Sequence, residues 1–123
     1  MENDMTHTFI NFTNHPSSLW DEAQIQAAEA FGPIIDIPFP AVAPNLSKEE
    51  ISELGDIFIK NILNYNPAAV LCQGEFTLAF YIASQLKKQG ITVLAACSER
   101  NTVIVENEKR SIFSFVQFRE YVI

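Results

Sequence analysis

Compact runs of apolar residues alternate along this chain with stretches whose apolar positions recur at helical spacing. The first run, residues 7–13, is β-branched and aromatic and ends at the polar cluster NHPSS, so it predicts a strand followed by a loop. Similar runs at residues 34–39, 68–73 and 91–97 predict three more strands. The last two are apolar almost throughout, which is typical of strands buried on both faces of a parallel sheet.

Between these strands lie segments whose apolar residues recur at helical spacing. An S-x-x-D capping pattern at Ser18 predicts a first helix that stops at Gly32. Ser47 and Glu50 form a capping box for a second helix, and a third closes with two lysines before Gly90. The order is therefore strand and helix in alternation, with short connections.

The pattern changes after the polar segment SERN. From residue 102 the sequence TVIVENEKRSIFSFVQF is two strand-like runs around a charged turn, which predicts a hairpin. Alternating strands and helices imply right-handed crossovers and helices on both faces of the sheet. We therefore predict an α/β fold: a Rossmann-like, mainly parallel sheet flanked by helices, with a C-terminal β-hairpin, in a single domain spanning residues 1–123.

The net charge of the chain limits the kinds of ligand and partner that it can bind. The chain has 123 residues, with 15 acidic and 8 basic side chains and a formal net charge of −7. This balance disfavours long nucleic acids and anionic membranes, but it allows one small anion in a local pocket. No basic leader and no apolar run of about 20 residues is present, so we expect a cytoplasmic protein without a membrane segment. Cys72 and Cys97 lie in apolar runs, where we expect them to pack as free thiols.

Ligands of such sheets bind outside the carboxyl ends of the strands, so the loops that follow strands hold the candidate residues. Helix N-termini there favour an anion, Gly74 would let a ligand approach the backbone, and the Arg100 guanidinium suits phosphate. His15 is the one histidine in such a loop and is a candidate general acid or base. The further candidates are Asn14, Ser17, Ser18, Gln73, Glu75, Phe76, Thr77, Ser98 and Asn101. No dinucleotide fingerprint, phosphate-binding loop or zinc spacing occurs, so we expect no metal and no other cofactor.

The same residues also allow a purely structural interpretation. Ser17 and Ser18 would then only cap a helix, and Gly74 would only turn the chain. Glu75 would complement the helix dipole in a first helical turn. Arg100 would pair with Glu99 or another carboxylate.

The NHPSS loop, the QGEFT turn and the SERN loop, on this strand-helix alternation, resemble the small stand-alone CARF-like proteins of type III CRISPR systems, including ring nucleases. That resemblance implies a homodimer that binds a cyclic oligoadenylate across its two-fold axis. It also implies metal-independent cleavage by the ribose 2′-hydroxyl. Arg100 would stabilise phosphate, Ser17 and Ser98 would contact phosphate or ribose, Gln73 would contact ribose or base, and His15 would assist proton transfer.

Two other functions stay open. Sites of that family often carry a lysine or a glycine-rich segment, whereas SERN offers one arginine beside Glu99, so the chain could bind the messenger without cleaving it. Alternatively, the C-terminal hairpin, which has apolar residues on both faces, could pair with a partner in a dimerising interaction domain.

Overall fold

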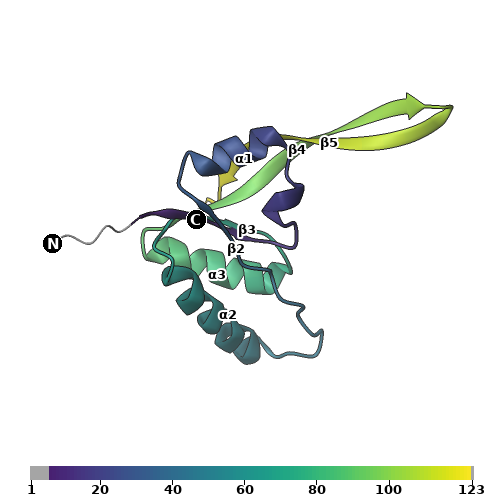
Figure 1. Ribbon diagram of the computed structural model, residues 1–123. Coiled ribbons are helices and arrows are strands. Elements are labelled where there is room, and N and C mark those ends of the chain that lie inside the picture. The colour runs from purple at the N-terminus through teal and green to yellow at the C-terminus, as the bar shows by residue number, and fades with distance from the viewer. Residues whose placement is uncertain (1–5, 123) are drawn as a thin grey trace.

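The protein forms one twisted sheet with helices on both faces (Figure 1). The computed structural model describes residues 6–122. In chain order its elements are β1 (Thr8–Phe12), the 3₁₀ turn η1 (Ser17–Leu19), α1 (Glu22–Glu29), β2 (Ile34–Asp36), α2 (Lys48–Leu63), β3 (Pro67–Cys72), α3 (Phe76–Lys88), β4 (Thr92–Val105) and β5 (Glu108–Glu120). The strand order is β2-β1-β3-β4-β5. The first four strands are parallel, and β5 is antiparallel to β4.

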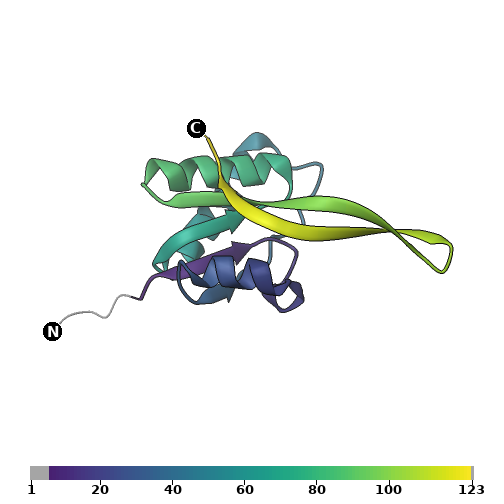
Figure 2. The same cartoon turned by 90° about the horizontal axis from the view of Figure 1, so that it is seen from above.

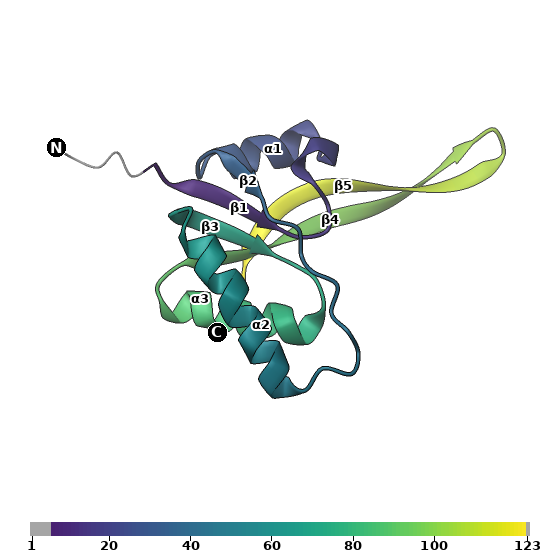
Figure 3. The same ribbon diagram turned by 60° about the horizontal axis from the view of Figure 1, so that its bottom comes forward.

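The two faces of the sheet have separate cores. α1 covers one face, and α2 and α3 lie side by side on the other (Figure 3). Because successive side chains of a strand point to opposite faces, Phe9 packs on the α1 side whereas Ile10 and Phe12 pack beneath α2 and α3. The predicted α/β class, with a mainly parallel sheet, flanking helices and a C-terminal hairpin, is confirmed.

Local capping chemistry explains where two helices begin. The predicted capping box of α2 is present: Glu50 N donates to Ser47 Oγ at 3.1 Å, and Ser47 N donates to Glu50 Oε1 at 2.8 Å. For α1 the predicted cap was wrong. The cap is Asp21, whose Oδ1 accepts from Gln24 N at 3.0 Å, and Ser18 lies one turn earlier in η1.

The largest correction concerns the segment SERN, which is not a loop. β4 runs without interruption from Thr92 to Val105, so Ser98, Glu99, Arg100 and Asn101 are strand residues paired with β5. The sheet therefore has five strands and not six. Polar residues fit here because β4 leaves β3 after Leu94, and the two-stranded part beyond has solvent on both faces.

We call this projecting part, residues 98–115, the arm. It extends well beyond the helices and the rest of the sheet (Figure 2). Its turn is formed by Glu106 and Asn107, both with positive φ, 53° and 66°, as a two-residue hairpin turn matched to strand twist requires. The arm thus carries three of the candidate residues away from a loop and onto a ribbon.

Candidate functional site

A pocket lies where the topology of the sheet changes direction. The chain leaves β1 toward β2 on one side and returns to β3 on the other, so the carboxyl ends of β1 and β3 flank a crevice. A pocket of ≈ 550 Å³ opens there. It is lined from the loop after β1 by His15, from the end of β3 by Gln73, and from the base of the arm by Ser98. Three predicted site residues from distant parts of the chain therefore meet.

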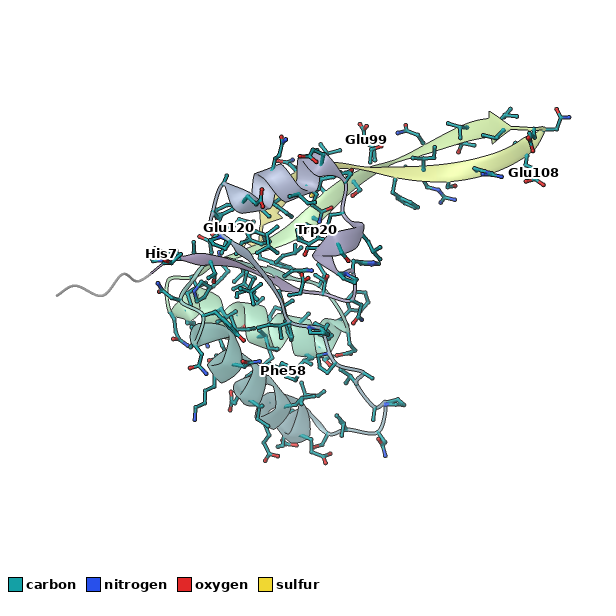
Figure 4. All side chains as sticks on the ribbon, viewed as in Figure 1. His7, Trp20, Phe58, Glu99, Glu108 and Glu120 are labelled. Atoms are coloured by element: carbon teal, nitrogen blue, oxygen red, sulfur yellow. The ribbon has the colours of Figure 1, made fainter. Side chains whose placement is uncertain are left out.

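Aromatic rings make the walls of this pocket. Trp20 precedes α1 (Figure 4). Phe113 and Phe115 come from β5. Phe118 packs edge-on against two rings of this wall, with ring centroids 6.4 Å from Trp20 and 4.8 Å from Phe115. Phe113 is 66% exposed, so part of its ring is accessible to a ligand. Flat, partly exposed rings beside polar groups suit the stacking of a nucleobase.

The loop that presents His15 is held by a buried amide. Asn11 is 1% exposed, and its Nδ2 donates to the His15 carbonyl at 2.9 Å and to Asp36 Oδ1 at 2.8 Å. Its Oδ1 accepts from the Thr13 hydroxyl at 2.8 Å. The His15 carbonyl also accepts from Trp20 Nε1 at 3.1 Å. The backbone of His15 is thus fixed to the sheet while its exposed imidazole lines the pocket.

Ser17 points to a different group. Its hydroxyl donates to Asp36 Oδ2 at 2.9 Å, and its backbone N–H donates to Asp36 Oδ1 at 3.3 Å. Asp36 is the last residue of β2, so this bond ties the loop after β1 to the neighbouring strand. Ser17 does not line the pocket.

Gln73 closes the end of β3. The pairing of β3 with β4 ends at Leu94. Gln73 Oε1 then accepts a hydrogen bond from Ala96 N at 2.7 Å, so this backbone N–H of β4 has a partner although β3 has ended. The side chain lines this pocket and also a second, apolar pocket of ≈ 440 Å³ beside α3. Gln73 therefore links the end of β3 to β4 and also lines the candidate site.

Arg100 is a residue of β4 and not of a strand-end loop. It does not line the pocket but lies beside the lining residue Phe113, a position that we call the rim. It pairs with Phe113 as Ser98 pairs with Phe115, so the four side chains share one face of the arm. Arg100 Nε donates to the Ser111 hydroxyl at 3.1 Å, and its guanidinium carbon is 5.9 Å from the Phe113 ring centre. Asn101 follows in the strand and therefore points to the opposite face.

The other residues of the QGEFT turn have structural roles or line other pockets. An added Cβ at Gly74 would lie 2.4 Å from the Phe39 ring, so this glycine is required for packing. Glu75 is the N-cap of α3 and not part of its first turn, because its Oε1 accepts from Leu78 N at 2.8 Å. That bond and the Thr77 hydroxyl lower the pKa of Glu75. Phe76 lines the apolar pocket beside α3.

Three more candidates lie elsewhere. Asn14 and Ser18 are exposed, and neither lines the pocket. Thr77 lines a third pocket, of ≈ 490 Å³, between α2 and α3. The structure thus brings together His15, Gln73 and Ser98, with Arg100 at the rim.

One carboxylate lines the pocket and limits where an anion can bind. Asp21 Oδ2 accepts from Phe115 N at 3.4 Å, while its Oδ1 caps α1. Phosphate groups of a ligand would therefore avoid this wall and lie toward Arg100. Within residues 6–122 no group of three or more His, Cys, Asp or Glu side chains could hold a metal ion. None of the helices in that range is long and apolar enough to cross a membrane.

Several residues of the site were not predicted from the sequence. Asn11 is the clearest case, and its signal was an amide flanked by Ile10 and Phe12 within an apolar strand. A buried polar group of this kind must find hydrogen-bond partners. Phe113 and Phe115 were predicted as apolar residues of the hairpin, without a role in the site.

Comparison with known proteins places the chain in a family. Residues 7–119 match the family model described as "Uncharacterized protein MJ1673 family". No curated protein matches the chain.

Proposed function

Because the chain belongs to the uncharacterized protein MJ1673 family, whose description names no activity, we propose its function from the pocket itself. The protein binds a cyclic oligoadenylate messenger there and cleaves it without a metal, as the CARF-like ring nucleases that it resembles do. It acts in the cytoplasm, and its active form is a homodimer.

One observation carries this proposal: the crevice between β1 and β3 combines partly exposed aromatic walls with His15, Gln73 and Ser98. The rings of Trp20 and Phe113 offer surfaces for adenine, because every base has a π-face on which an aromatic side chain can stack. The amide of Gln73 and the hydroxyl of Ser98 supply hydrogen-bonding groups for ribose or base. A pocket of ≈ 550 Å³ has room for one nucleotide unit of such a ring.

The reaction requires little from the protein beyond alignment. The ribose 2′-oxygen attacks the adjacent phosphorus, the bond from phosphorus to the 5′-oxygen breaks, and the proton of the 2′-hydroxyl is transferred to the leaving 5′-oxygen. The product is a linear chain with a 2′,3′-cyclic phosphate and a 5′-hydroxyl. His15 is the imidazole available to accept and return that proton, and Arg100 stabilises the phosphate from the rim. Ser17 takes no part in this scheme, because its hydroxyl donates to Asp36.

A second function is favoured by the electrostatics of the pocket. Asp21 is a carboxylate within the lining, and only one imidazole is present there. Both features weaken phosphate activation more than base stacking. The second candidate is therefore a module that binds and sequesters the same messenger without cleaving it.

The deciding experiment incubates the purified protein with cyclic oligoadenylates of several ring sizes in EDTA. We expect linear products with 2′,3′-cyclic phosphate ends. His15→Ala should lower the cleavage rate about 100-fold or more, in the range of general acid–base catalysis. The matched control is His7→Ala, since His7 is exposed at the start of β1, away from the pocket.

Each outcome has a defined meaning. Equal rates in wild type and His15→Ala would remove His15 from the chemistry. Tight binding with the ring recovered intact would select the sequestering module. Absence of both binding and cleavage for every ring size would overturn the proposal.

A further inference from the structure

Within residues 6–122, one edge of the arm makes no backbone hydrogen bonds. Backbone groups of a strand alternate in direction, and Ala96 N points away from β5 to reach Gln73. The same alternation turns the N–H and C=O groups of Ser98, Arg100, Thr102 and Ile104 outward, on the side of β4 that β3 no longer covers. We call these four residues the β4 edge. Among the described residues, no backbone hydrogen bond is made to this edge.

The other edge of the arm is interrupted. β5 has a register shift opposite Cys97 and Ser98 that leaves Val116 as an extra residue, and such a bulge bends a strand out of line. The outward N–H of Phe115 is occupied by Asp21 Oδ2. Bulges and covering groups are the usual means by which proteins block strand addition. The β5 edge is therefore blocked at the base of the arm, at Phe115 and Val116, where the β4 edge is open.

The ribbon also exposes apolar side chains on both faces. Ile104 is 71% exposed and Ile112 is 47% exposed, from opposite faces of the arm. A two-stranded ribbon alone in water is marginal, and added strands supply both hydrogen bonds and side-chain cover. Glu99 and Glu108 mark the near and far ends of this uncovered ribbon in Figure 4.

We propose that a second copy of this chain pairs with the β4 edge, antiparallel, so that the two arms form a four-stranded ribbon. The two-fold axis passes beside Asn101. Ser98 then lies opposite Ile104 of the second copy, and Arg100 lies opposite its Thr102. All four outward residues of each edge meet outward residues of the other, which gives about eight backbone hydrogen bonds, two for each facing pair.

Charge favours this register and a second copy as the occupant. Sliding the second copy by two residues in one sense places Arg100 opposite Arg100, a like-charge pair that destabilises a sheet. A shift in the other sense leaves Ser98 facing the turn, with three pairs in place of four. The segment 98–115 holds Glu99, Glu106 and Glu108 against Arg100, Lys109 and Arg110, so it is neutral, whereas the whole chain carries −7. Pairing through the arms therefore joins two copies where their repulsion is smallest.

This interface does not depend on the nucleotide, so it is tested without one. Thr102→Pro removes an outward N–H of the β4 edge and leaves the β4–β5 ladder intact, because edge positions that face solvent tolerate proline. The control is Ser111→Pro, the residue paired with Thr102, which changes the β5 edge instead. Light scattering should give twice the chain mass of 13.8 kDa for wild type and Ser111→Pro, and the chain mass for Thr102→Pro.

A cross-link tests the register. In a Cys97→Ser background, Asn101→Cys should oxidise to a covalent dimer, since the two Cα atoms across the axis are about 4.5 Å apart, within disulfide reach. Glu99→Cys should not, because it faces residue 103 of the second copy. A monomeric wild type, a dimer that survives Thr102→Pro, or loss of the dimer only in Ser111→Pro would overturn the proposal.

Discussion

The buried amide of Asn11 is the feature on which the shape of the site depends. Asn11→Ala removes three hydrogen bonds, to the His15 carbonyl, to Asp36 Oδ1 and from the Thr13 hydroxyl, at 2.8 to 2.9 Å. A buried neutral bond contributes about 1 kcal/mol, and one to a charged group about 1.5–3 kcal/mol. Water can reach the exposed Asp36 and offset part of this loss. We therefore expect a loss of about 3 kcal/mol in the free energy of unfolding.

Urea unfolding followed by circular dichroism measures this loss directly. Asn61→Ala, at an exposed position of α2, is the matched control and should change stability by less than about 0.5 kcal/mol. The melting temperature of Asn11→Ala should fall by roughly 10 °C. A loss below about 1 kcal/mol would show that the His15 loop is held by other contacts, and the reasoning about Asn11 would be refuted.

Two further predictions concern the core. Gly74→Ala should destabilise the protein by about 1–3 kcal/mol in urea unfolding, because the added Cβ would lie 2.4 Å from the Phe39 ring. The control Gly90→Ala should cost less, because its Cβ would have no described atom within 4 Å and would add only the strain of a φ of 80°. Equal losses in the two variants would contradict the packing role of Gly74. Burial raises the pKa of the Cys72 thiol to about 12, so stability is retained below pH 9 and falls as pH rises from about 9 toward 12. Native protein at pH 8 should be alkylated at the partly exposed Cys97 and not at Cys72, as peptide mass mapping would show; labelling of Cys72 first would contradict its burial.

The sheet could be predicted because its signals are local. Apolar strand runs, the Ser47 capping box and the strand-helix alternation each depend on a few neighbouring residues, and the structure confirms them. The SERN segment misled because a polar tetrapeptide after a buried strand is typical of a loop. Only the pairing of residues 98–105 with β5 shows that these residues have no need to be apolar.

The site could be predicted only in part for a similar reason. The rule that ligands bind at strand carboxyl ends located His15 and Gln73. The aromatic wall required knowledge that β5 folds back beside β4 and brings Phe113 and Phe115 next to Trp20, about 95 residues away in the chain. Likewise, the engagement of Ser17 by Asp36 depends on the parallel pairing of β1 with β2.

Trp20 provides the most direct test of the central claim, because it is the single tryptophan of the chain and lines the pocket. Titration of cyclic oligoadenylate into the protein should change its fluorescence with a saturable curve, and linear adenylate of equal length should bind more weakly. Phe113→Ala should weaken binding about 5- to 100-fold, the loss of one stacked base. Fluorescence that stays constant while the ligand binds, or equal affinity in Phe113→Ala, would show that this pocket is not where the messenger binds.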